Sequence, residues 1–536
     1  MLEFAPVIGA LARVACGHPF ASLIAALGAL YVTHCAFEWA TRPAAMKLAA
    51  PRRRPRGTLP IFYNTFQSLA NAHHIYDWLV AQCERFDGKP YWLQLVGGPS
   101  VVVLSTPEHF EEVLKTHFET FDKGPIMNEN LRDLLGDGIF AVDSAKWVHQ
   151  RKTASNLFSL RSLRESMAES IQKHALVLNK VFDRAARSQQ SLDLFKLLNR
   201  FTMETFAEIG FGVELGALAS DHDHAFQAAF DSAQRVLGYR FMRPQWTWKL
   251  QRYLNIGAEK GLKRSIQVIN DTVFGIIEQS LENRRMSTSR STLPQGKKDI
   301  VSLFLDHMSD DHASKSDPFD PTFLRDIVVN FLIAGRDTTA QALSWFFYCL
   351  SQHPDVEHKI RAELAAKLPE LMRGAIAHPS MEQVNQLPYL EAALRETLRL
   401  YPSVPANIKH ATKDTLFHDG TFIRQNEGAV ISSYVLARMT HVWGHDAKEY
   451  RPERWLDAKS GRLVSESAFK FNTFHAGPRM CLGMNLAMME MKIVVAMVVA
   501  RFHLALVPGQ HITYDFSLTH PIKGALMMNV TSSSAV

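Results

Sequence analysis

The chain has 536 residues, of which 47% are hydrophobic and 21% are charged, and this composition supports a large buried core in a globular body. Its 59 basic and 53 acidic residues leave a net charge of +6, which is too small for a nucleic-acid-binding protein and implies at most a weak attraction to an acidic protein or an anionic membrane surface. Five scattered cysteines without a C-x-x-C pair argue against a disulfide framework and favour a reducing compartment.

The first predicted element is an apolar stretch near the N-terminus. Residues 20–37 contain no Asp, Glu, Lys or Arg over 18 positions, which is long enough for a helix that crosses a membrane. A basic, proline-containing cluster follows at 47–56, whereas Arg13 is the only basic residue before the stretch, so the positive-inside rule places the rest of the chain on the cytosolic side. A cleaved signal peptide is the alternative. The expected organisation is an N-terminal membrane anchor over residues 1–45, a stiff basic hinge over 46–60 and one catalytic domain over 61–536.

The body beyond the hinge is expected to be one mainly helical unit. Long helices are predicted by hydrophobic periodicity at 160–186, 266–285, 326–352 and 387–400. Short strand-like runs occur only at 91–105 and 429–438, which indicates a small sheet that is split along the chain.

A tryptophan and an arginine stand one helical turn apart in "KWVHQRK" at 146–152. On a helix, Trp147 and Arg151 share a face because they are spaced i, i+4. The arginine fork suits a carboxylate, but W-x-x-x-R is common by chance and carries no assignment by itself.

The apolar segment "FLIAGRDTTAQALSWFF" at 331–347 contains a polar interruption. Its flanks are too apolar for an exposed helix, so an interior helix with a functional face is favoured over a solvated stripe. The hydroxyl of Thr338 can bond the carbonyl of Ala334 one turn earlier and open the helix locally. A hydroxyl beside the carboxylate of Asp337 can relay protons. Chemistry alone gives Arg336 no role.

A glutamate and an arginine in "ETLR", Glu396 and Arg399, lie at spacing i, i+3 on an apolar helix and therefore share a face. Arg454 in "RPERW" offers a further guanidinium. The alternative is an ordinary surface ion pair, which contributes little to stability.

The stretch "FHAGPRMCLG" at 474–483 surrounds a lone cysteine. Gly477 and Gly483 let the backbone approach a large flat group, and Arg479 adds a cation. Cys481 lies just before a predicted helix, whose N-terminus favours a thiolate. A lone cysteine is commonly a small apolar core residue. A buried thiolate without a proton acceptor needs a metal, however, and a single thiolate is an axial ligand of haem iron.

With these motifs in this order, the chain resembles the cytochrome P450 family of haem-thiolate monooxygenases from about residue 55 to its end. The resemblance implies that family's mainly α fold with a small split sheet, in which haem b lies between the long central helix and the cysteine loop. It implies Cys481 as the iron ligand, with Asp337 and Thr338 as the proton relay. The other residues it implies are Phe474, Gly477 and Gly483 in the haem loop, Trp147, Arg151 and Arg479 at the haem propionates with Lys409 or His410 as a further candidate, and Glu396, Arg399 and Arg454 as a structural network.

The segments 331–354 and 239–262 resemble the branch of the family that hydroxylates fatty acids and alkanes. The expected reaction inserts one oxygen atom of O2 into a C–H bond of a long-chain lipid, at a terminal or subterminal carbon. The aromatic and basic residues of 239–262 suit a flap at a membrane surface or a packed helix end.

Because only a short stretch follows Cys481, electrons are expected from NADPH through a separate NADPH-cytochrome P450 reductase. The expected location is the endoplasmic reticulum membrane, with the catalytic domain on the cytosolic side. The alternatives are a monooxygenase that acts on a specialised metabolite or sterol, and a haem-thiolate isomerase or dehydratase that does not use O2.

Overall fold

The computed structural model describes residues 49–218, 225–289, 299–311 and 320–533, together with a few positions between 25 and 36. Most of the membrane anchor predicted over residues 1–45, including most of its apolar stretch at 20–37, therefore lies outside the described residues. In the part of the chain that is described, no helix is both long enough and apolar enough to cross a bilayer.

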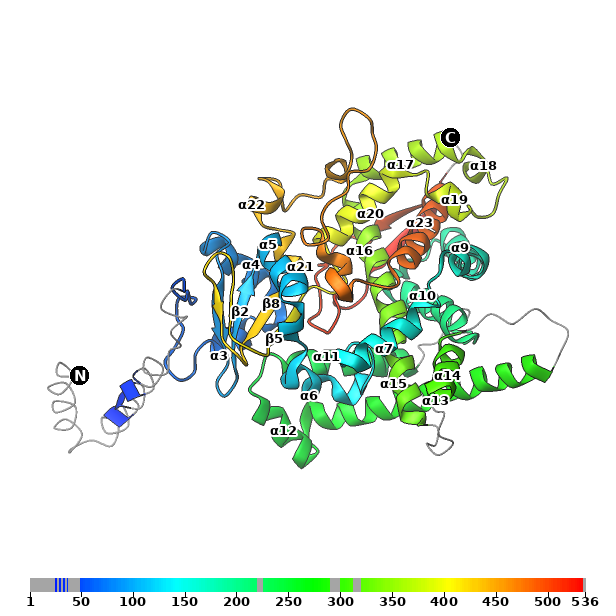
Figure 1. The fold of residues 1–536 in the computed structure, drawn as a ribbon. Coiled ribbons are helices and arrows are strands. Elements are labelled where there is room, and N and C mark those ends of the chain that lie inside the picture. The colour runs from blue at the N-terminus through cyan, green and yellow to red at the C-terminus, as the bar shows by residue number, and fades with distance from the viewer. Residues whose placement is uncertain are drawn as a thin grey trace.

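Helices make up most of the body, as the sequence predicted (Figure 1). In chain order they are α3 (Thr65–Ala70), α4 (Ile75–Arg85), α5 (Pro107–Glu111), α6 (Gly124–Leu135), α7 (Ser144–Ser155), α8 (Leu160–Ser162), α9 (Ala168–Ser188), α10 (Leu194–Phe211), α11 (Ala225–Arg240), α12 (Gln245–Leu254), α13 (Gly257–Ser289), α14 (Ile300–Asp311), α15 (Pro321–Leu332), α16 (Thr338–Gln352), α17 (Pro354–Lys367), α18 (Pro369–Met372), α19 (Met381–Val384), α20 (Pro388–Leu400), α21 (Ser433–Leu436), α22 (Thr440–Trp443) and α23 (Met484–Arg501).

The strands form small sheets, which confirms the predicted fold class. The five-stranded sheet has the order β1-β2-β8-β5-β3, and within it β2 and β8 run parallel while the other neighbours are antiparallel. Figure 1 shows this sheet on one side of the molecule, with most helices on the other. The strands are β1 (Tyr91–Gln94), β2 (Ser100–Leu104), β3 (Phe121–Asp122), β4 (Leu192–Asp193), β5 (Asn407–Ala411), β6 (Thr415–Leu416), β7 (Phe422–Ile423), β8 (Gly428–Ile431), β9 (Phe502–Leu506) and β10 (Met527–Ser532).

Only the first part of the strand predicted at 429–438 is observed. Strand β8 ends at Ile431, and the side chain of Ser432 then accepts a hydrogen bond from the backbone N–H of Val435. This N-cap starts the short helix α21, because a serine in that position satisfies a backbone donor that a helix start otherwise leaves unpaired.

A continuous helix from α15 to α16 runs through the interior of the helical part (Figure 1). It begins with Asp320, whose side chain caps the N–H of Thr322 at 2.8 Å, and with Pro321 in the first helical position. A single π-helical turn, Ile333–Asp337, interrupts it. Helices α10, α20 and α23 pack against it, and the element is therefore positioned to present its side chains to the interior.

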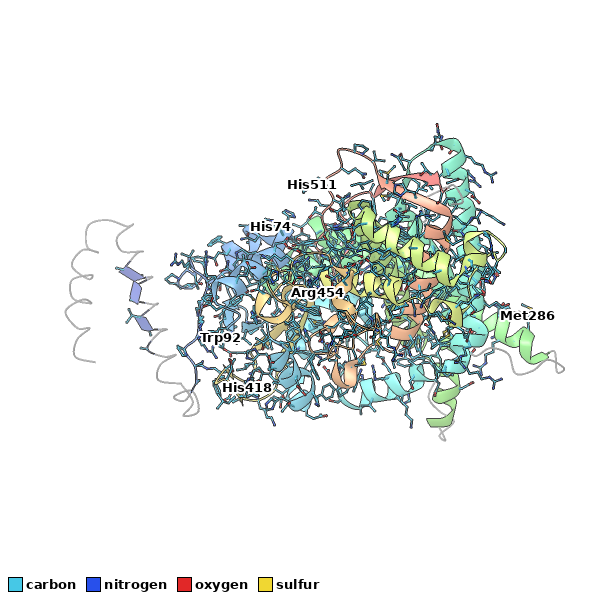
Figure 2. The ribbon with its side chains drawn as sticks, turned by 90° about the horizontal axis from the view of Figure 1, so that it is seen from above. His74, Trp92, Met286, His418, Arg454 and His511 are labelled. Carbon is cyan, nitrogen blue, oxygen red and sulfur yellow. The ribbon has the colours of Figure 1, made fainter. Side chains whose placement is uncertain are left out.

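The second half of the predicted hinge is bound to the sheet. Arg52 donates to both carboxylate oxygens of Glu427 at 2.6 and 2.8 Å. The carbonyl of Arg53 accepts from the N–H of Trp92 at 2.8 Å. Figure 2 shows Trp92 and His418 at the sheet end of the molecule. From Arg52 onward, the predicted hinge is therefore held against the sheet.

Candidate functional site

The cysteine loop leads directly into α23 and is held by its own backbone. The N–H of Cys481 donates to the carbonyl of Phe474 at 2.9 Å. Gly477 has φ +66°, and a Cβ there would clash with the carbonyl oxygen of Leu114. At Gly483 the nearest atom to such a Cβ would be 3.7 Å away, in Phe158. The glycine at 477 is thus required by a close approach to the chain itself, whereas the one at 483 leaves room.

Cys481 is exposed to solvent, unlike the buried Cys83 and Cys349, and all three are free thiols. Burial by the surrounding protein nevertheless raises the pKa of Cys481, although the N–H of Gly483 and the charge of Arg151 act in the opposite direction. The Cys481 side chain is therefore accessible, although protein atoms surround most of it. The helix N-terminus is therefore not sufficient to hold a thiolate, and a metal cation would be needed to stabilise it.

The central helix contains a half-buried strip within an otherwise buried stretch. The strip includes Ala334 and Thr338, whereas Leu332 and Ala340 are buried. The Thr338 hydroxyl donates to the carbonyl of Ala334 at 2.7 Å, beside the π-helical turn. A Cβ at Gly335 would clash with the ring of Phe206, so this glycine faces α10. The bond and the local opening expected from the sequence are therefore both present.

Asp337 is 2% exposed and faces away from that strip. Its carboxylate accepts from Arg336 Nη1 at 2.7 Å and from Gln234 Nε2 at 2.6 Å. Burial raises the pKa of Asp337 to about 6, although the Arg336 cation lowers it and Asp231 raises it further. The group can therefore exchange a proton near neutral pH. Gln234 and Asp231 were not predicted from the sequence, because both come from another helix, α11.

Two arginines converge on Trp147 beside the cysteine loop. The guanidinium carbons of Arg479 and Arg151 lie 4.4 and 5.7 Å from the centre of its ring. Arg151 donates to the carbonyl of Met480 at 2.7 Å, and Arg479 donates to the carboxylate of Asp143. Helix α7 is thus tied to the cysteine loop through these side chains.

Arg479 and two buried lysines, Lys409 and Lys123, lie close together and form a basic corner. Lys409 is 1% exposed, its Nζ has no hydrogen-bond partner among the described residues, and burial together with neighbouring cations holds its pKa well below the usual value. Burial also lowers the pKa of Lys123 to about 8. His410 instead bonds Asp122 at 2.9 Å. An unpaired buried ammonium is costly, so the corner fits an anionic group such as the propionates of a haem.

Lys123 was missed from the sequence. It follows the two-residue strand β3, and no periodicity or motif separates it from an exposed lysine. Lys409, by contrast, lies on β5, where alternation places it on the buried face.

Glu396, Arg399 and Arg454 are brought together with their side chains buried, and Figure 2 shows Arg454 near the middle of the body. Arg399 donates to both oxygens of Glu396 at 2.8 Å, and Arg454 Nε donates to one of them at 3.3 Å. Trp455 Nε1 donates to the other at 2.9 Å. Arg399 also donates to the carbonyls of Ala437 and Ala447. The network therefore joins α20 to the segments that follow α21 and α22.

Several known proteins are similar to this chain over most of its length. The family described as "Cytochrome P450" matches residues 54–527. The chain is 37% identical over 477 residues to cytochrome P450 86B1 of Arabidopsis thaliana, covering 86% of this chain and 82% of that protein. It is 34% identical over 499 residues to cytochrome P450 704B1 of the same plant, covering 87% and 93%. To cytochrome P450 94A2 of Vicia sativa it is 31% identical over 486 residues, covering 89% and 90%.

Proposed function

We propose a long-chain lipid substrate for this chain, which belongs to the cytochrome P450 family and is a cytochrome P450 monooxygenase. The proposed reaction is hydroxylation of a fatty acid or alkane at a terminal or subterminal carbon. The observation that carries this proposal is the resemblance of the central helix, "FLIAGRDTTAQALSWFF" at 331–347, to the fatty acid and alkane hydroxylating branch.

For the cofactor, we assign haem b to a site beside the cysteine loop. Cys481 would supply the thiolate ligand, and the desolvated thiol favours a site where a metal cation compensates the charge. Arg151, Arg479 and the unpaired Lys409 would face the propionates, with Trp147 packed between the arginines. Bound haem supplies the reductive activation of dioxygen that amino acid side chains cannot perform.

The protein residues then handle protons and orientation. We assign Thr338 and Asp337 to proton delivery, because these two residues, adjacent in the sequence, carry a hydroxyl and a carboxyl whose pKa is raised to about 6. We assign Glu396, Arg399 and Arg454 to holding the segments around the cysteine loop. The charge-assisted bonds between them are buried, and this supports a structural role.

Two exposed apolar surfaces support a membrane-bound location. Phe66 on α3 is 55% exposed, and Trp246 and Tyr253 on α12 are 62% and 86% exposed. Trp248 on the same helix is buried against Arg240 at 4.1 Å, so α12 is amphipathic. Helices of this kind lie in a membrane interface. With the predicted anchor over residues 1–45, this supports a body on the cytosolic side of the endoplasmic reticulum that receives electrons from NADPH-cytochrome P450 reductase.

Turnover of a panel of fatty acids and alkanes with the reductase and NADPH tests the substrate proposal. Oxidation of long-chain lipids at or near the chain end is expected. Oxidation of sterols or terpenoids alone would favour the alternative monooxygenase function. An isomerase or dehydratase would act on lipid peroxides in the absence of O2 and NADPH.

A further inference from the structure

Arg243, between α11 and α12, is a half-buried cation without an acidic partner in the part of the chain that the structure describes. Its guanidinium carbon instead lies 5.6 Å from the centre of the Tyr239 ring. The other cations of the segment 235–252 are paired: Arg235 with Asp515, Arg240 with Glu259 and Asp133, Lys249 with Glu129, and Arg252 with Asp133. The donors of the Arg243 guanidinium are therefore available to an anion.

Two further polar groups lie beside this cation, where the end of α11 approaches the short turn η2 (Ala72–His74). The hydroxyl of Tyr239 lies 2.9 Å from Nδ1 of His73, and the His73 side chain is exposed. Burial raises the pKa of Tyr239, so the phenol keeps its proton near neutral pH and remains a possible donor. A guanidinium, a hydroxyl and an imidazole thus lie around one tyrosine ring.

The backbone that carries Arg243 is held in place by Arg240, the last residue of α11. The Arg240 side chain is 1% exposed, donates to the carbonyl of Asn130 at 2.8 Å and pairs with Glu259 at 2.5 Å and with Asp133 at 2.8 Å. A group that orients a ligand must itself be fixed by its surroundings. The chain position of Arg243, three residues later, meets that requirement.

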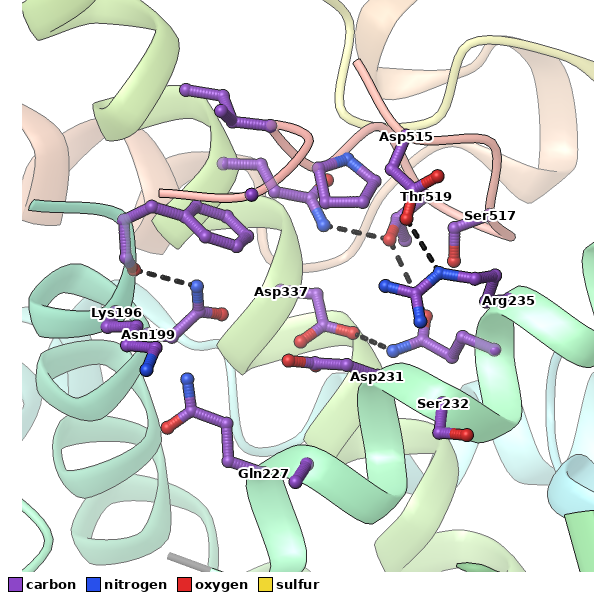
Figure 3. Close-up of a pocket in the computed structure, with 17 residues that line it drawn as sticks. Lys196, Asn199, Gln227, Asp231, Ser232, Arg235, Asp337, Asp515, Ser517 and Thr519 are labelled. Carbon is purple, nitrogen blue, oxygen red and sulfur yellow. Dashed lines mark hydrogen bonds and ion pairs between the residues drawn. The ribbon is translucent and has the colours of Figure 1, made fainter. Parts of the chain in front are cut away.

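The C-terminal segment packs against the same end of α11. The ring of Phe516 lies 5.3 Å from the ring of Tyr239. One turn earlier on α11, Arg235 donates to the carboxylate of Asp515 at 2.6 Å, and Figure 3 shows this pair. Because Asp515 is already paired with Arg235, the positive charge of Arg243 remains uncompensated.

From Phe516 the C-terminal segment reaches the central helix within four residues. The N–H of His520 donates to the carbonyl of Ser403 at 3.0 Å, and the Ser403 hydroxyl donates to the carbonyl of Thr338 at 2.7 Å. Four residues span at most about 14 Å. A lipid tail reaches about 15 Å, since two tails fill the ~30 Å hydrocarbon core of a bilayer. A lipid whose head lies at Arg243 can therefore extend its far end toward the strip that carries Thr338.

We propose that Arg243 binds the carboxylate of a fatty acid substrate, with Tyr239 and His73 beside it, and that the chain end of the lipid points toward Thr338. The inference rests on the proposed lipid substrate and selects one of its two forms, a lipid with an anionic head over an alkane. The fork of a guanidinium matches a carboxylate in charge and geometry. A fixed head also determines which carbon lies near Thr338, and this favours oxidation near the chain end.

Calorimetric titration of the haem-loaded enzyme with palmitic acid and with methyl palmitate tests the carboxylate contact. Arg243→Gln should weaken binding of the acid about tenfold to a hundredfold, because bonds to a charged group are lost, and should leave binding of the ester unchanged. Arg243→Lys keeps the charge and should lose less. Lys249→Gln, which removes a cation paired with Glu129, is the matched control and should change neither affinity. Equal losses for acid and ester, or no loss for the acid, would overturn the assignment.

The position of hydroxylation gives a second readout. With the unmodified enzyme, products of palmitic acid should be confined to carbons near the chain end. With Arg243→Gln they should spread over several carbons, because the head is no longer held, and with Lys249→Gln they should stay confined. Mass spectrometry of the hydroxylated acids measures the distribution, and an unchanged pattern in Arg243→Gln would show that Arg243 does not fix the substrate.

The phosphate of a membrane lipid is the competing anion, since Trp246, three residues after Arg243, is 62% exposed on α12. If Arg243 bound that phosphate instead, Arg243→Gln would leave the affinities for palmitic acid and methyl palmitate unchanged, and the proposal would be overturned. If the lipid substrate itself were wrong, neither compound would bind to the unmodified enzyme. The two failures are therefore distinguishable.

Discussion

The guanidinium of Arg399 holds the carboxylate of Glu396 through two hydrogen bonds of 2.8 Å, and both side chains are almost fully buried. Loss of one partner of a buried ion pair leaves the other charge uncompensated. Arg399→Met should therefore lower the free energy of unfolding by about 3–5 kcal/mol. Urea unfolding of the haem-loaded enzyme measures the loss.

The matched control for this pair lies on the same helix. Arg395 and Glu391 form an i, i+4 pair with side chains that are 26% and 16% exposed. Arg395→Met should cost less than Arg399→Met, because the Arg395 pair is partly exposed to solvent and Lys492 remains beside Glu391. Equal losses in the two variants would show that Glu396 and Arg399 are no more important than a partly exposed pair.

The Thr338 hydroxyl tests the proton assignment. Thr338→Ala removes the group that donates to Ala334, so product per NADPH should fall several-fold while NADPH consumption continues and hydrogen peroxide is released. Thr338→Ser keeps a hydroxyl and should retain most of the coupling. Stoichiometry of NADPH, product and peroxide checks this, and full coupling in the alanine variant would remove Thr338 from proton delivery.

Loss of the unpaired Lys409 side chain should affect the apoprotein and the haem-loaded protein in opposite directions. Lys409→Met should leave the apoprotein as stable or more stable, because an uncompensated buried cation is removed. It should also speed haem loss to an acceptor protein about tenfold or more, since a bond to a charged group contributes about 1.5–3 kcal/mol. Exposed Lys413→Met is the control. Faster unfolding of the apoprotein with unchanged haem loss would refute the propionate contact.

Glu490 on α23 gives a pH prediction. Burial raises its pKa from 4.5 to about 8, and Oε1 finds no hydrogen-bond partner among the described residues. The folded state then holds the proton more tightly than the unfolded state, so stability falls as pH rises from about 4.5 to about 8. Glu490→Gln should flatten this part of the stability curve, whereas the exposed Glu382→Gln should not. If stability depended on pH in the same way in Glu490→Gln, the carboxyl of Glu490 would have to be solvated in the folded protein.

The sequence predicted best where a pattern is local and repeated. The cysteine loop and the helices α20 and α23 follow from motif spacing and periodicity, and the bond from Thr338 to Ala334 follows from a hydroxyl one turn after a carbonyl. The strand prediction at 429–438 was wrong beyond Ile431, because the side chain of Ser432 caps the start of a helix in a stretch that otherwise favours a strand.

Contacts between distant segments could not be predicted. Gln234 reaches Asp337 across 103 positions of chain, and nothing in the local pattern of α11 indicates that bond. Lys123 approaches Arg479 and Lys409 only after β3 pairs with β5. Arg336 likewise donates to Asp231 on another helix.

The most direct test of the account is the carbon monoxide difference spectrum of the reduced enzyme and of Cys481→Ala. Thiolate ligation should give the red-shifted band typical of haem-thiolate proteins in the unmodified enzyme and remove it in the variant. Substitution of the buried Cys349 by alanine should leave the band in place. Retention of the full band in Cys481→Ala would contradict the assignment of the iron ligand.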